Sequence, residues 1–148
     1  MEIAGNTLAE RQPREVRYHI TRSGDAYTMN VRRMDSHGGW IASAGSLARF
    51  AAAADGRWIP RLLRPETVTQ MSATNELHPN YARGWRVNAR GNAWHTGSLP
   101  GTATMMVRTA SGLTWAALCN TRVDESTLGR DLDRPMWTMA KAVPRWRA

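Results

Sequence analysis

The stretch WHTGSLPG, residues 94–101, places a histidine, a threonine, a glycine and a serine next to one another. Histidine changes its protonation near neutral pH, and hydroxyls both donate and accept hydrogen bonds, so these residue types are common in active sites. One interpretation of the stretch is a wall of an active site. The alternative is a tight connection, in which Gly97, Pro100 and Gly101 supply the turn and His95 lies beside it.

The residues around this stretch do not supply a complete catalytic group by themselves. His95 and Ser98 are too close along one strand for a proton relay, and no acidic residue is placed to orient the histidine. The four histidines show no metal-ligand spacing such as i, i+4, so we expect no metal site. GSLPG has two glycines and does not open a helix, which excludes a phosphate-binding loop. We expect no cofactor.

The segments that flank the stretch have the pattern of strands. Two of them are separated by ARGN and two by SG, and both are typical hairpin turns. The expected strands are residues 84–88, 93–98, 102–110 and 113–121. Together they predict an antiparallel meander with the histidine on its second strand.

Three helices are expected around these strands. The first lies between Ser43 or Ser46, as a cap, and Gly56, as the terminating residue. Its apolar face at helical spacing consists of Leu47, Phe50, Ala51 and Ala54. The second covers 64–71, with Pro65 in its first turn and Val68 and Met71 buried. The third closes the chain at 131–143, with Asp131 or Asp133 as cap and an apolar stripe of Met136, Trp137 and Ala140.

The N-terminal third gives weaker signals. Residues 1–14 are polar and expected to be loose, while 15–20 and 26–31 are expected as two strands joined by a turn at 21–25. The order of elements predicts an α+β fold in which an antiparallel sheet of about four strands packs with helices. We expect residues 1–148 to form a single domain.

The composition is that of a globular chain, with 42% apolar and 22% charged residues and no apolar run long enough to span a membrane. The N-terminus shows no signal-peptide pattern, and the compartment is left open. The net charge is +8, and Lys141 is the only one of the twenty basic residues that is not arginine. Because the arginines are scattered rather than clustered, a nucleic-acid partner is unlikely.

Three segments, taken in order, resemble the serine β-lactamase-related family, which includes class C β-lactamases, DD-peptidases and related esterases. GGWIASAGSLARFAAAADG (38–56) is similar to the Gly-Gly-Trp segment and helix of that family. LLRPETVTQM (62–71), followed by YARGWRVN (81–88), is similar to its next helix and strand. HTGSLPGTATMMVRTASGLTWAALCNTR (95–122) is similar to its third active-site box. The resemblance is good over residues 34–122, weaker over residues 10–33, and poor over the last twenty-five or so residues of the chain.

The resemblance implies a partial β-lactamase/transpeptidase-like fold and assigns roles to four residues. His95 would orient the substrate or assist proton transfer, and Thr96 would hydrogen-bond a substrate carboxylate. Gly97 would let the substrate backbone approach the strand, and the backbone N–H of Ser98 would be one of two oxyanion donors. The reaction in that family is hydrolysis of a small-molecule or peptide amide or ester through an acyl-serine.

The other two active-site boxes of the family are absent from the 148 residues. No serine is followed three residues later by lysine, and neither Tyr-x-Asn nor Ser-x-Asn occurs. Ser46 and Arg49 have the first spacing, but an arginine does not deprotonate to act as a base. The chain therefore resembles the C-terminal part of such an enzyme, after its nucleophile and base.

We consider three functions. The first is a portion of a serine β-lactamase or penicillin-binding-protein-like hydrolase that is inactive alone and requires an N-terminal partner carrying the nucleophile. The second is a non-catalytic remnant that binds a ligand or forms a homodimer through an apolar sheet face with Trp85, Trp94, Met105, Met106 and Trp115. The third, ranked last, is a basic nucleic-acid-binding module.

Overall fold

The computed structural model describes the chain except for residues 1, 20–21, 23, 57–60, 123–130 and 145–148. The fold is α+β, as predicted. Two compact units are formed: one comprises Met1–Ser43, Thr96–Thr104 and Ala117–Ala142, and the other Ala44–His95, Met105–Ala116 and Val143–Ala148. The elements are β1 (Glu2–Ile3), η1 (Leu8–Glu10), η2 (Ala26–Thr28), α1 (Val31–Met34), η3 (Asp35–His37), β2 (Trp40–Ile41), α2 (Ala44–Asp55), α3 (Pro65–Ser72), β3 (Arg86–Val87), β4 (Ala93–Leu99), β5 (Thr102–Arg108), β6 (Thr114–Cys119) and α4 (Arg134–Ala142).

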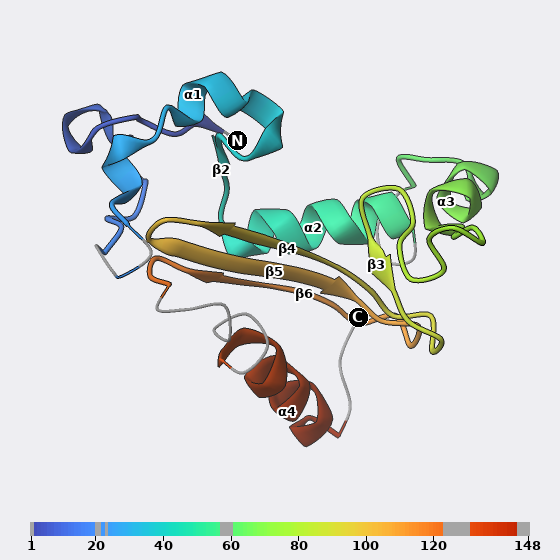
Figure 1. The fold of residues 1–148 in the computed structure, drawn as a ribbon. Coiled ribbons are helices and arrows are strands. Elements are labelled where there is room, and N and C mark those ends of the chain that lie inside the picture. The colour runs from blue at the N-terminus through green and yellow to red at the C-terminus, as the bar shows by residue number, and fades with distance from the viewer. Residues whose placement is uncertain (1, 20–21, 23, 57–60, 123–130, 145–148) are drawn as a thin grey trace. The chain divides into compact units, whose positions relative to one another are not determined.

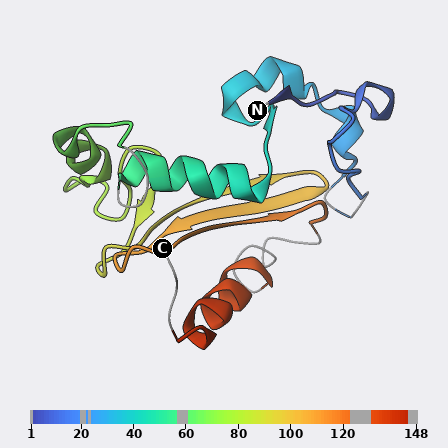
Figure 2. The ribbon, with the colours of Figure 1, turned by 180° about the vertical axis from the view of Figure 1, so that it is seen from behind.

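The predicted meander is present as a four-stranded sheet with the order β3-β4-β5-β6 (Figure 1). The turns before and after β5 lie at opposite ends of that strand (Figure 2), and each contains a glycine with positive φ, Gly101 and Gly112. The ARGN turn precedes β4, and the Asn88 side chain accepts hydrogen bonds from the backbone N–H groups of Arg90 and Asn92. Local turn chemistry therefore fixes this part of the fold.

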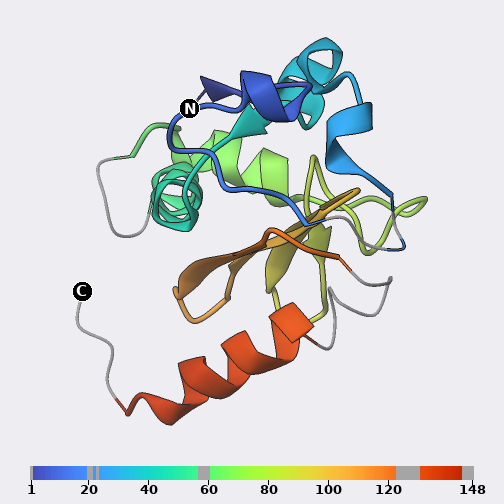
Figure 3. The same ribbon diagram turned by 90° about the vertical axis from the view of Figure 1, so that its left-hand side faces the viewer.

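In the second unit, α2 packs on the sheet face that carries Ala93. Ala51 of α2 and Ala93 of β4 are fully buried, Trp85 is largely buried beside them, and Val87 and Met106 pack against this cluster. Figure 3, which views α2 nearly end-on, shows the helix on one side of the strands. Small side chains at the contact allow the helix to approach the sheet closely.

The predicted buried face of α2 is partly wrong. Ala51 and Ala53 are the buried residues of the helix, whereas Phe50 is 50% exposed. The helix ends as expected, because Gly56 has a φ of +67° and its N–H bonds to the carbonyl of Ala52 at 2.9 Å.

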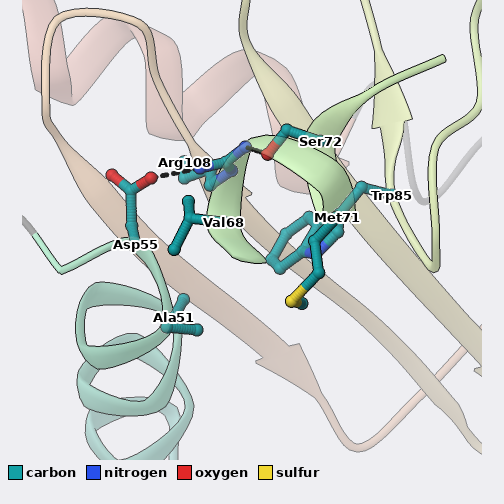
Figure 4. Close-up of a pocket in the computed structure, with 8 residues that line it drawn as sticks. Ala51, Asp55, Val68, Met71, Ser72, Trp85 and Arg108 are labelled. Carbon is teal, nitrogen blue, oxygen red and sulfur yellow. Dashed lines mark hydrogen bonds and ion pairs between the residues drawn. The ribbon is translucent and has the colours of Figure 1, made fainter. Parts of the chain in front are cut away.

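Arg108 connects three elements of this unit (Figure 4). Its guanidinium is paired with the carboxylate of Asp55, at the end of α2, and donates to the hydroxyl of Ser72, at the end of α3. The guanidinium carbon also lies 5.7 Å from the centroid of the Trp85 ring. The side chains of Arg108 and Asp55 are only 14% and 6% exposed, so this is a buried ion pair.

Helix α3 starts at Pro65, as the sequence predicted. Proline has no N–H, and this suits the first helical turn, where an N–H group would have no partner within the helix. Val68 and Met71 are half-buried rather than buried, and both line the small cavity around Arg108. The open volume of this cavity is about 10 Å³, which is room for at most a single water. It is a packing junction between helices and strand.

In the first unit, residues near the N-terminus are ordered, contrary to the expectation that 1–14 would be loose. Strand β1 pairs with β2 in an antiparallel register, with Glu2 opposite Ile41 and Ile3 opposite Trp40. A side chain on Gly39, just before β2, would place its Cβ 2.2 Å from the carbonyl oxygen of Val31. Only glycine fits at this position of the Gly-Gly-Trp segment.

The two strands predicted at 15–20 and 26–31 are wrong. The described part of the first, residues 15–19, has no regular secondary structure. In the second, the Asp25 side chain accepts a hydrogen bond from the N–H of Tyr27 at 2.9 Å and caps a 3-10 helix over Ala26–Thr28. Residues 26–28 therefore form a helical turn where a strand was predicted.

The closing helix begins at residue 131, as predicted, with a π-helical turn over 131–133 that continues into α4 at Arg134, and none of the residues of α4 is buried. Met136, Trp137 and Ala140 of the predicted apolar stripe are half-buried. Burial raises the pKa of the Asp133 carboxyl, and the hydrogen bond with Trp137 lowers it in part.

The buried ion pair predicts a large loss of stability when one partner is neutralised. In the variant Asp55→Asn, the Arg108 guanidinium stays buried without a counter-charge, and we expect a loss of about 3–5 kcal/mol in urea unfolding. The double variant Asp55→Leu with Arg108→Met should recover much of this loss.

The matched control is the pair between Glu2 and Arg14, at 3.9 Å, whose side chains are 52% and 90% exposed. Glu2→Gln should cost less than about 1 kcal/mol, because exposed pairs contribute little. An equal cost for Asp55→Asn and Glu2→Gln would contradict the assignment of Arg108 as a junction residue.

Candidate active-site wall

The four residues singled out in the sequence lie consecutively on β4. Side chains alternate along a strand, so His95 and Gly97 point to one face and Thr96 and Ser98 to the other. Ala93 lies two residues before His95 and therefore points to the same face, which is the face that α2 covers. The four side chains thus form two pairs on opposite faces of one strand.

His95 is exposed, and its ring orientation is set by the backbone of the neighbouring turn. Its Nδ1 lies 2.7 Å from the carbonyl oxygen of Gly84, which precedes β3. A carbonyl oxygen only accepts, so Nδ1 carries the proton and the neutral ring keeps its lone pair on Nε2. This is the tautomer in which Nε2 can accept a proton from a bound group.

The structure gives a steric reason for a glycine at position 97 that the sequence did not reveal. A Cβ on Gly97 would lie 2.5 Å from the hydroxyl oxygen of Thr104, on the neighbouring strand β5. The same hydroxyl donates to the carbonyl of Gly97 at 3.3 Å. The missing side chain therefore makes room for an internal hydrogen bond.

On the opposite face, the hydroxyl of Ser98 accepts a hydrogen bond from the guanidinium of Arg122. Arg122 follows the end of β6, which lies at the same end of the sheet as the end of β4, with β5 between the two strands, because consecutive strands of the meander run in opposite directions. A half-buried cation thus lies next to the face with the Thr96 and Ser98 hydroxyls. Guanidinium and hydroxyl groups are donors that suit a carboxylate.

Arg122 was not among the residues singled out in the sequence. In the sequence, the only sign of it was a cation shortly after the uncharged strand TWAALC. Its partner Ser98 is 24 residues away, and the distance along the chain hides the contact.

A strand pairs with the outer edge of β4 over only part of its length. Strand β3 pairs with β4 only at Trp94 and Ala93. In the described part of the chain, no strand lies against the outer side of the segment 96–99. Such an edge presents backbone donors and acceptors that an extended ligand can use.

The sequence contains neither the Ser-x-x-Lys nor the Tyr-x-Asn box whose lysine or tyrosine would activate a serine hydroxyl. Lys141 lies on α4, and Ser46 and Arg49 lie on exposed positions of α2. Burial, and next Glu15, raise the pKa of the Tyr18 hydroxyl, which therefore stays protonated and serves as a donor. No group of three or more potential metal ligands was found among the described residues.

Comparison with known proteins identifies the family. The family model described as Beta-lactamase matches residues 3–134. No curated protein and no solved structure matches the chain. The match covers most of the 148 residues, so the chain belongs to the Beta-lactamase family, and the fold is a partial β-lactamase-like fold.

The contact between Gly97 and Thr104 predicts how substitutions at these positions combine. Gly97→Ala should destabilise the protein by about 1–3 kcal/mol in urea unfolding, because the new methyl group overlaps the Thr104 hydroxyl. In a Thr104→Ala background, the same substitution should cost little. Thr104→Val, which keeps a group at the γ position, is the control that should retain the cost. Equal costs in all three backgrounds would refute the steric explanation.

The hydrogen bond to Gly84 predicts the tautomer of His95. Long-range ¹H–¹⁵N correlation spectra of the neutral side chain should show the proton on Nδ1, because the Gly84 carbonyl accepts it. His78 is exposed, and none of its described hydrogen bonds involves the ring, so it is a suitable reference for the usual Nε2–H form. Finding Nε2–H at His95 would exclude the geometry described above.

Proposed function

We propose that this Beta-lactamase family chain carries the substrate-binding wall of an acyl-serine hydrolase and that it is inactive without a polypeptide that supplies the nucleophile. The observation that carries the proposal is the arrangement on β4: a histidine with a free Nε2 lone pair on one face of the strand and, on the other face, a serine hydroxyl that a guanidinium contacts. The substrate class is an amide or ester that also carries a carboxylate.

Each residue of the wall has a separate task in this proposal. His95 orients the substrate or accepts a proton through Nε2, while Nδ1 remains bound to Gly84. Thr96 and Ser98 present hydroxyls to the substrate carboxylate, with Arg122 neutralising its charge. The backbone N–H of Ser98 serves as one oxyanion donor. The open edge of 96–99 supports an extended pose of the substrate along the strand.

The requirement for a partner follows from what hydrolysis through an acyl-serine needs. A serine hydroxyl is a weak nucleophile and is activated by a neighbouring base. None of the eight serines in the sequence is followed by lysine at the third position. Arginine, which supplies nearly all of the positive charge, remains protonated and does not act as a base.

The second candidate function is a non-catalytic remnant that binds a ligand or a second copy. The sheet face suggested for it in the sequence is not exposed: Trp85, Met105 and Trp115 are buried, and Trp94 and Met106 are half-buried. Self-association through that face is therefore disfavoured. A nucleic-acid-binding module is ranked last, because no observation favours it.

Acylation is the direct test of the catalytic half of the proposal. The folded chain, incubated with a reactive penicillin, should show no stoichiometric adduct by intact-mass analysis, either before or after denaturation. An adduct on the folded chain alone would show that a nucleophile exists within the 148 residues, and peptide mapping would locate it. That result would overturn the requirement for a partner.

Binding is tested separately with the hydrolysed penicillin, which carries carboxylates but cannot acylate. In ¹H–¹⁵N spectra, titration with this compound should shift the amide signals of Thr96 and Ser98. The affinity read from these shifts should fall by about tenfold in Arg122→Met, because a charge-assisted hydrogen bond is lost. Arg90→Met is the matched control, because Arg90 is an exposed cation on the turn before β4. Equal effects of both variants would contradict a specific role of Arg122.

A further inference from the structure

The pairing of β3 with β4 stops one step before His95. Two residues of each strand are paired, and one more step of the same register would place Trp85 opposite His95. Residues 82–85 form a turn instead, in which the N–H of Ala82 donates to the carbonyl of Trp85 at 2.8 Å. At this point the His95 ring donates through Nδ1 to the carbonyl of Gly84 at 2.7 Å. Beyond the paired residues, the hydrogen bond between the two segments therefore comes from a side chain.

This turn requires glycine at position 84 because of its backbone conformation. The φ of Gly84 is +80°, a value that residues with a side chain rarely adopt. Space is not the reason, because a Cβ on Gly84 would meet no heavy atom of a non-neighbouring residue within 4 Å. Gly84 differs in this respect from Gly97, where a Cβ would overlap a hydroxyl. The dihedral angles at Gly84 set the direction of its carbonyl, and with it the position of the acceptor for His95.

The end of α3 holds the turn from the other side. The backbone N–H of Arg83 donates to the carbonyl of Met71 at 3.2 Å, and the Arg83 guanidinium donates to the carbonyl of Gln70. Both carbonyls belong to the last turn of α3, where carbonyl groups have no partner within the helix. On the other side of Gly84, the side chain of Trp85 is buried. Gly84 thus lies between two anchored residues, and its carbonyl is held in place for the histidine.

We propose that Gly84 is a positioning residue for His95, with Arg83 as its anchor. The Gly84 carbonyl keeps the proton on Nδ1, so that Nε2 retains the lone pair that the proposed wall uses. The turn has a second effect: because β3 begins only after it, no described strand pairs with the segment 96–99. The inference rests on the proposed function for the use of His95, but the tautomer of the ring does not depend on a ligand.

The test measures the ratio of the Nδ1–H form to the Nε2–H form of neutral His95, from the ¹⁵N shifts in long-range ¹H–¹⁵N spectra of the full chain. Gly84→Val introduces a β-branched residue, which disfavours a positive φ, and so displaces the carbonyl of residue 84. We expect the ratio to fall by about tenfold, as for the loss of one hydrogen bond. Gly84→Asn tolerates a positive φ and should keep the ratio within about twofold of the unmodified chain.

Gly91→Val is the matched control. Gly91 has a φ of +77° in the turn before β4, and its described hydrogen bonds do not involve His95. The substitution should lower the urea midpoint as Gly84→Val does, while the tautomer ratio of His95 stays unchanged. If Gly84→Val does not fold, Arg83→Met decides, because it removes the bond to α3 without straining the backbone and should lower the same ratio. An unchanged ratio in these variants, or an equal fall in Gly91→Val, would overturn the role of Gly84.

Binding of the hydrolysed penicillin separates this inference from the proposed function. If the unmodified chain does not bind that compound, the proposed function fails, while the tautomer ratios still decide the role of Gly84. If the chain binds it, Gly84→Val should weaken the affinity by about fivefold, because Nε2 then carries the proton and no longer accepts one. Gly91→Val should leave the affinity unchanged. A lower tautomer ratio in Gly84→Val without a loss of affinity would keep Gly84 as the positioning residue and remove His95 from the binding wall.

Discussion

The side-chain alternation of β4 and β5 is the constraint on which the rest of the sheet depends. Along β5, Ala103, Met105 and Val107 are buried, while Met106 and Arg108, which alternate with them, are half-buried and face α2. A shift of one residue would exchange the two faces and bring Arg108 to the wrong side for Asp55. The glycine turns at both ends of β5 prevent that shift.

The same alternation explains why a row of four chemically useful residues does not form one cluster. His95 and Gly97 share the face with Thr104, and Thr96 and Ser98 share the other. A ligand that uses both sets has to lie along the strand edge rather than over one face. The edge at 96–99, with which no described strand pairs, is therefore as important to the proposed wall as its side chains.

The parts of the fold that were predictable from the sequence are those determined locally. The hairpins around Gly91 and Gly112, the end of α2 at Gly56 and the start of α3 at Pro65 depend on nearby residues, and these turn and terminus signals were correct. The pairing of β1 with β2 joins residues almost forty positions apart, and two-residue strands leave no periodic pattern. The contacts of Arg108 and Arg122 are equally remote in sequence, so the ion pair and the cation at Ser98 required the structure.

The use of arginine in this chain also limits its chemistry. Arg108 and Arg122 hold elements together or contact a hydroxyl through several fixed donors, a task for which a guanidinium is better suited than an ammonium. The same property prevents these residues from accepting a proton, because the guanidinium stays charged at every relevant pH. Lysine, which can lose its proton when buried, occurs once, on the exposed position 141 of α4. In the proposed function these cations would bind and neutralise an anionic substrate, but they would not supply a base.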